Sequence, residues 1–189
     1  MARRAGLFVV LAVLGAALVG TLATFAVAQS GSQRFSADRM RGTFEIPAVS
    51  TVARGEFEAR LVNTSTGPAI DYELSYENLE GEVTQAHIHF AQNFANGGIV
   101  AWLCETTTNN DPTTDKACPP DDGTVVEGRI TPAQITASGG AQRIAAGDFD
   151  EVVAAMRAGL TYANVHTVGS ATGEIRAQIR RGGGGDDDD

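Results

Sequence analysis

The three histidines of the chain lie in two short segments whose spacing suits metal binding. One residue separates His87 from His89, and His166 follows Asn164 at the same interval. Side chains alternate between the two faces of a β-strand, so each pair would share one face of its own strand. If the two strands are neighbours, three imidazoles converge, and a set of three nitrogen ligands suits copper or zinc.

Two other roles stay open for these histidines. They could hydrogen-bond across a sheet, with Asn164 and Gln85 fixing their tautomers. They could also take part in catalysis, but the sequence has no Gly-x-Ser-x-Gly elbow and no phosphate-binding glycine loop before a helix. We therefore expect no catalytic residues and no enzymatic activity. The candidate cofactor is copper or zinc, held by His87, His89 and His166.

The segments around the histidines alternate apolar and polar residues, as strands do. The pattern is clear over residues 56–61, 70–76 and 174–179, and residues 99–103 form a nearly continuous apolar run. Alternation with one apolar face is typical of antiparallel sheets. On the polar face of the last segment, Glu174 and Arg176 could support the histidines through hydrogen bonds, or could form an exposed cross-strand pair.

Two short helices are expected between the strands. Thr131 and Gln134 have the spacing of a capping box around Pro132, which predicts a helix ending near residue 137. Residues 148–151 form a similar box, and the helix that it opens would end near Gly159. The fold class is therefore all-β, an antiparallel sandwich or barrel with two short helices.

The first 28 residues have the features of an export signal. Arg3 and Arg4 precede an uncharged, mostly apolar stretch that ends in Ala26-Val27-Ala28, a pattern that signal peptidase accepts. The alternative is an uncleaved N-terminal anchor, because the stretch is long enough to span a bilayer. The expected location is secreted or extracytoplasmic, or the cell surface if the segment is retained. Residues 29–35 read as a flexible lead-in, 36–180 as one domain and 181–189 as a disordered Gly/Asp tail.

Charge and cysteine content fit an exported protein. Removing residues 1–28 takes away two of the 14 basic residues and no acidic one, which leaves 12 against 23 and disfavours nucleic acid as a partner. A membrane partner is expected only if the N-terminal segment is kept. Cys104 and Cys118 are expected to form a disulfide, the alternative being two free thiols. The acidic residues of the polar loop between them match no known calcium-loop spacing.

Several motifs occur together in an order that resembles the CHRD domain, the module first named in the animal protein chordin. They are Glu45-Ile46-Pro47-Ala48-Val49, Ala86-His87-Ile88-His89, Gly128-Arg129-Ile130-Thr131, Ala155-Met156-Arg157-Ala158-Gly159, Tyr162-Ala163-Asn164-Val165-His166-Thr167 and Gly173-Glu174-Ile175-Arg176-Ala177-Gln178. The resemblance spans about residues 35–179. It implies a secreted or surface-exposed β-rich module with an immunoglobulin-like barrel, acting as a binding or structural domain toward an extracellular protein.

The His-x-His segment is also similar to a strand motif of copper/zinc superoxide dismutases, which are exported β-sandwiches. Those enzymes need more histidines and a ligand aspartate. With three histidines in total, this chain cannot build their two-metal site. The likeness therefore extends the expectation to a superoxide-dismutase-like sandwich and to a metal site, and it does not extend to dismutase activity.

Overall fold

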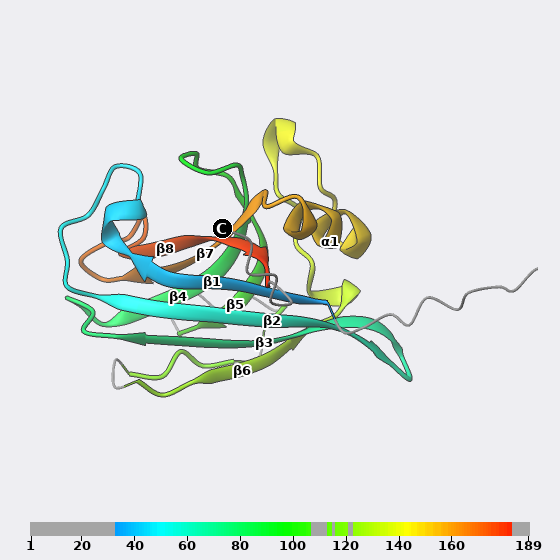
Figure 1. The fold of residues 1–189 in the computed structure, drawn as a ribbon, viewed down its shortest axis with the longest axis horizontal. Coiled ribbons are helices and arrows are strands. Elements are labelled where there is room, and N and C mark those ends of the chain that lie inside the picture. The colour runs from blue at the N-terminus through cyan, green and yellow to red at the C-terminus, as the bar shows by residue number, and fades with distance from the viewer. Residues whose placement is uncertain (1–32, 107–112, 115, 121–122, 183–189) are drawn as a thin grey trace, which may run out of the picture.

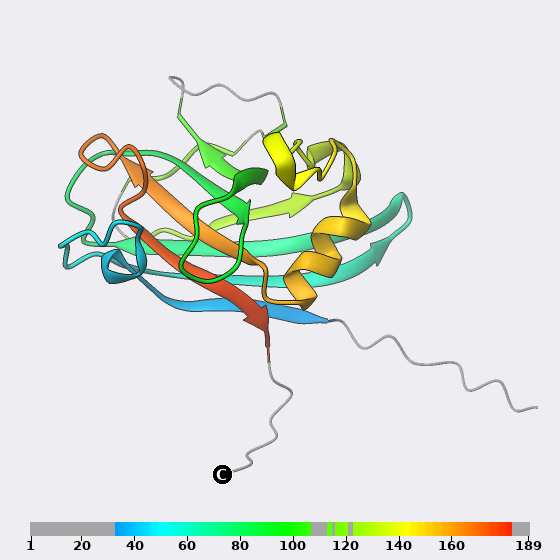
Figure 2. The same ribbon diagram turned by 90° about the horizontal axis from the view of Figure 1, so that it is seen from above.

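The computed structural model describes residues 33–106, 113–114, 116–120 and 123–182. Eight antiparallel strands in these residues form one sheet in the order β5-β4-β7-β8-β1-β2-β3-β6, and the sheet curls into a nearly closed barrel (Figures 1 and 2). The strands are β1 (Arg34–Arg41), β2 (Arg54–Thr64), β3 (Gly67–Glu77), β4 (Val83–Phe90), β5 (Gly98–Glu105), β6 (Val126–Ile130), β7 (Thr161–Thr167) and β8 (Ile175–Arg181). The all-β antiparallel prediction is confirmed.

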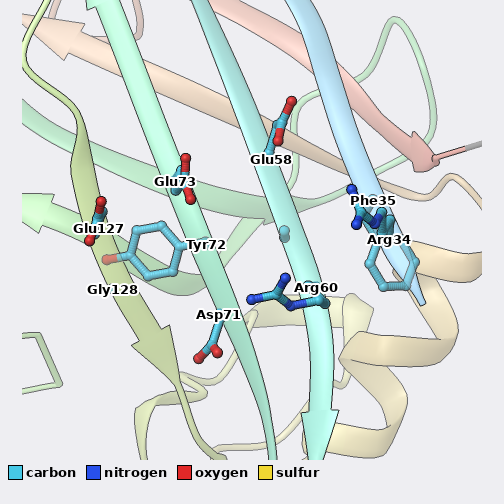
Figure 3. A pocket seen from close by; sticks show the side chains of 10 residues that line it. Arg34, Phe35, Glu58, Arg60, Asp71, Tyr72, Glu73, Glu127 and Gly128 are labelled. Carbon is cyan, nitrogen blue, oxygen red and sulfur yellow. The ribbon is translucent and has the colours of Figure 1, made fainter. Parts of the chain in front are cut away.

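The two edge strands, β5 and β6, meet at the seam of the barrel. Ala101 of β5 forms an isolated bridge with Ile135, which follows β6. The Tyr72 hydroxyl of β3 donates a hydrogen bond to the Leu103 carbonyl of β5, over 2.5 Å. To reach it, the Tyr72 ring passes over Gly128 of β6, where a Cβ atom would lie 2.3 Å from the ring (Figure 3). Glycine at this position therefore lets a side chain of β3 connect to β5 across the seam.

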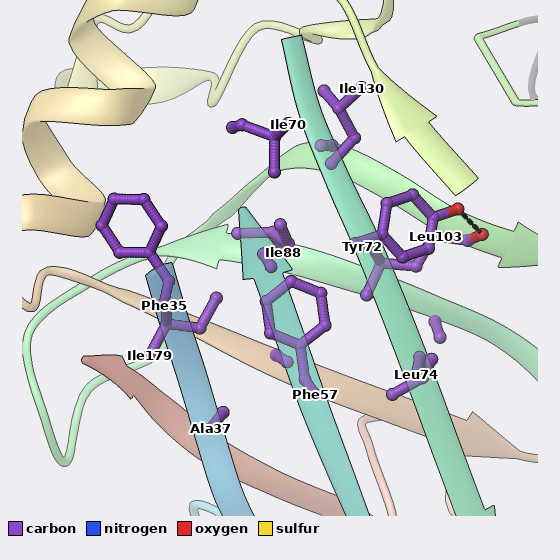
Figure 4. Packing of buried hydrophobic residues seen from close by; sticks show 14 of the residues in the cluster. Phe35, Ala37, Phe57, Ile70, Tyr72, Leu74, Ile88, Leu103, Ile130 and Ile179 are labelled. Atoms are coloured by element: carbon purple, nitrogen blue, oxygen red, sulfur yellow. Dashed lines mark hydrogen bonds between the residues drawn. The ribbon is translucent and has the colours of Figure 1, made fainter. Parts of the chain in front are cut away.

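The core lies inside the barrel and receives side chains from all eight strands (Figure 4). Phe57 and Tyr72 stack within it at 6.3 Å between ring centroids. Ile88 of β4 and Val165 of β7 are fully buried in this core. Because alternate residues point to opposite faces, the histidines of the same strands lie outside it.

The helical predictions are confirmed in one place and wrong in the other. The second predicted helix is α1 (Phe149–Arg157), which packs against β8. The first is a single 3-10 turn, η2 (Pro132–Gln134), which is fixed by Gln134 Oε1 accepting hydrogen bonds from the Thr131 amide and hydroxyl. The chain does not continue into a longer helix because Ile135 turns back to extended geometry and is buried. Two further 3-10 turns are η1 (Gly42–Phe44) and η3 (Gly140–Gln142).

The predicted disulfide between Cys104 and Cys118 is present, and it ties the end of β5 to the segment before β6. Strand β1 begins at Arg34 and buries Phe35, so the folded domain starts two residues before the predicted boundary at 36. The predicted export signal, residues 29–32 of the lead-in and the tail from 183 onward lie outside the described residues, as does much of the acidic loop. No helix in the described part of the chain has the length and apolar character needed to cross a membrane.

Candidate metal centre

Strands β4 and β7 are hydrogen-bonded neighbours, as a shared histidine site requires. Their register places His87 opposite Asn164, His89 opposite Tyr162 and Gln85 opposite His166. The side chains of His87, His89 and His166 therefore lie on the outer face of the same part of the sheet. One ring nitrogen from each imidazole lies within 4.8 Å of the others. A point between the three nitrogens is then at most about 2.8 Å from each, so small movements of the side chains would reach the metal–nitrogen distance of about 2.0–2.1 Å.

Backbone carbonyls fix the tautomers of two of these imidazoles. His89 donates from Nδ1 to the Gly97 carbonyl over 2.9 Å, and His166 donates from Nδ1 to the Ala171 carbonyl over 3.0 Å. A carbonyl can only accept, so Nε2 of both rings carries the lone pair. A hydrogen bond from Nδ1–H to a carbonyl is the usual support of a metal-ligating histidine.

The third imidazole completes the cluster. His87 Nδ1 lies 3.2 Å from His166 Nε2, and its ring stands perpendicular to the Trp102 indole at 4.3 Å between centroids. The Nε2 atoms of His87 and His89 are buried and have no hydrogen-bond partner among the described residues. Buried nitrogens are nearly always partnered, and an unpartnered one costs about 1–3 kcal/mol. Two such nitrogens in one cluster indicate a site in which a ligand would supply the missing interaction.

The cluster is closed to solvent, which keeps the imidazoles neutral. The exposed fractions of His87, His89 and His166 are 0%, 8% and 6%. Burial, with the neighbouring histidines, lowers the pKa of His87 to about 2, and burial lowers the pKa of His89 to about 4. The pKa of His166 is also lowered by burial. Since a metal binds the neutral ring, none of the three imidazoles has to lose a proton before binding one at neutral pH.

Behind His89, three planar groups are stacked. The Tyr162 ring lies parallel to His89 at 4.7 Å, and the guanidinium of Arg176 lies over the other side of the stack, 4.7 Å from the Tyr162 centroid. Arg176 donates from Nε to the Phe44 carbonyl over 2.7 Å and from Nη1 to Asn96 Oδ1 over 3.0 Å. These bonds hold the turns before β2 and β5 against the histidine-bearing strands.

Glu45 is a buried carboxyl group beside this stack. It accepts a hydrogen bond of 2.6 Å from Asn164 Nδ2, and its Oε2 lies 3.5 Å from Arg176 Nε. Burial raises the pKa of Glu45 to about 7, and the attraction of Arg176 and the Asn164 hydrogen bond only partly oppose this. Gly173 leaves room for the pair: its φ is +120°, and a Cβ atom there would lie 2.4 Å from Asn164 Nδ2.

The structure changes the roles expected for the polar neighbours of the histidines. The proposed exposed pair of Glu174 and Arg176 is wrong, because both are buried. Glu174 binds the hydroxyls of Thr51 and Thr167 and does not bind a histidine. Asn164 and Gln85 do not fix the histidine tautomers. The carbonyls of Gly97 and Ala171 do, and backbone groups of turns give no signal in side-chain spacing.

A hollow of about 270 Å³ on the outside of β1, β2, β3 and β6 offers no comparable chemistry (Figure 3). The Asp71 carboxylate in its lining is paired with Arg129 of the neighbouring strand. Arg129 makes two hydrogen bonds to the Asp71 carboxylate, and this contact lowers the pKa of Asp71. Paired charges on an open strand surface are typical of a solvated face.

Comparison with protein-family models matches residues 35–179 to the CHRD domain. This range agrees with the extent of the motifs identified in the sequence. No curated protein and no solved structure matches the chain.

Proposed function

Since the chain belongs to the CHRD domain family, we propose that it is an extracytoplasmic binding module without catalytic activity whose site holds one copper or zinc ion. His87, His89 and His166 supply the ligands. The other ligand expected for such a module is an extracellular protein, but no feature of the described residues points to a particular protein partner. The two unpartnered Nε2 atoms of the triad do point to a metal ion.

The closed geometry supports holding an ion rather than turning over a substrate. Catalytic metal sites keep an open coordination position for water or substrate, whereas structural sites are closed. The three imidazoles are buried, and His89 and His166 are hydrogen-bonded to the turns that contain Gly97 and Ala171. Trp102 and Tyr162 cover two of the rings. A substrate large enough to react would have to displace these groups.

Metal titration of the purified protein, after treatment with chelator, tests the proposal. Copper and zinc are added separately, and bound metal is counted by elemental analysis after gel filtration. We expect one ion per chain in the wild type and none in the His87→Ala/His89→Ala double variant. Gln85→Ala, on the same strand and outside the triad, is the matched control and should bind like the wild type. Binding that is equal in wild type and double variant would refute the site.

A further inference from the structure

The triad is a set of neutral donors. Among the described residues, no aspartate, glutamate or cysteine joins the group of nitrogen atoms that could hold an ion. The charge of a filled site is therefore the charge of the ion. The cation Arg176 is separated from His89 by one ring, that of Tyr162. Glu45 faces Arg176 and Asn164 rather than the triad.

Because the site is buried, the free energy needed to move an ion into it from water increases with the charge of the ion. Solvent reaches none of His87 and only a few per cent of His89 and His166. The cost of placing an ion in such surroundings grows steeply with its charge, and the usual compensation is an anionic ligand. A divalent ion would keep both charges uncompensated here, whereas a monovalent ion would keep one.

The number of donors leads to the same conclusion. Zinc in closed protein sites takes four ligands, and copper(II) takes four or more in tetragonal geometry. Asn164, which lies opposite His87 in register, is engaged with Glu45 and the Ile175 carbonyl. Among His, Cys, Asp and Glu, the described residues thus supply three imidazole donors, at a site closed to bulk solvent. A filled-shell monovalent ion is satisfied by three nitrogen donors.

On these grounds, and resting on the proposed metal site, we infer that the triad selects copper(I) over zinc(II) and copper(II). The matching class of ligand is a soft monovalent d¹⁰ cation. Silver(I) belongs to the same class and does not change oxidation state in air, so it serves as a probe for copper(I).

The test compares four ions on the intact protein. Copper(I) is titrated without oxygen against a colorimetric chelator, and silver(I), zinc(II) and copper(II) are titrated by competition or calorimetry. We expect binding of copper(I) and silver(I) to the triad, with zinc(II) weaker than copper(I) by about 100-fold or more, as the cost of a second buried charge implies. Zinc(II) or copper(II) binding as tightly as copper(I) overturns the inference and leaves the proposed metal site standing. If no ion binds, both are refuted.

A variant with an anionic ligand tests the charge argument directly. His166→Asp replaces one neutral donor by a carboxylate at the ligand position nearest the Ala171 turn. The ratio of zinc(II) to copper(I) affinity should rise by about 10-fold or more relative to the wild type. An unchanged ratio contradicts the argument. His89→Asp is the second variant if circular dichroism shows that His166→Asp does not fold.

Discussion

Replacing Glu45 by glutamine is expected to change how the stability of the protein depends on pH. Burial raises the pKa of this carboxyl group from 4.5 to about 7. The folded state therefore binds more protons than the unfolded state between these values, and the free energy of unfolding falls as the pH rises from about 4.5 to 7. Glutamine has nearly the same shape and stays neutral, so the variant lacks this loss.

The magnitude follows from the interval between the two pKa values. At about 1.4 kcal/mol for each pH unit, the fully developed effect is about 3 kcal/mol. Between pH 5 and pH 8 the stability of Glu45→Gln should therefore rise relative to the wild type by about 2–3 kcal/mol. The titration of all other groups is common to both proteins and cancels in the difference.

Urea denaturation followed by circular dichroism at pH 5, 6, 7 and 8 measures this difference. Asp71→Asn is the matched control. The pKa of Asp71 is lowered from 3.8 by Arg129, so its variant should differ from the wild type by a constant amount over this range. A Glu45→Gln difference that stays constant, or that falls as the pH rises, would refute the reasoning. It would show that Arg176 keeps the buried carboxylate ionised.

Three further predictions concern stability, each read from urea denaturation. Gly173→Ala should destabilise the protein by more than about 1 kcal/mol, because its Cβ atom collides with a buried amide at positive φ. Gly169→Ala, in open space, should change little, and equal losses would contradict this account. Reducing the disulfide of Cys104 and Cys118, 14 residues apart, should cost about 3 kcal/mol, and an unchanged midpoint would refute a stabilising role. Phe57→Ala, in the barrel core, should cost about 3–5 kcal/mol, and a loss typical of a surface site would contradict the packing described.

Alternation predicted five of the eight strands and an apolar run predicted β5, and the two strands that were missed have identifiable reasons. Strand β1 buries Phe35 and Ala37 but next buries Met40, because the register shifts between residues 37 and 40. Arg39 takes a positive φ of 59° within this irregularity. Strand β6 has the period of two, but its central inward position is Gly128, whose space the Tyr72 ring fills. Neither strand can be recognised from alternating apolar residues. One is interrupted by a register shift, and the other has a glycine where an apolar side chain would be expected.

The candidate site could be predicted only in part. Pairwise spacing placed His87, His89 and His166 on matching faces, and the pairing of β4 with β7 confirms it. The spacing does not reveal that this face is closed to solvent by the turns before β2, before β5 and after β7. Which turn covers which strand depends on contacts distant in sequence, such as that of Glu45 with Asn164. Local patterns do not contain this information.

If the triad holds an ion as proposed, the covering turns would also set the rate at which that ion exchanges with the surroundings. The carbonyls of Gly97 and Ala171 are bonded to His89 and His166, and an ion entering the buried site would have to displace turns that these bonds hold in place. Entry and departure would then follow the frequency of local unfolding and not the rate of diffusional encounter. Uptake should therefore reach a ceiling as the concentration outside increases, and an ion once enclosed should have a long residence time.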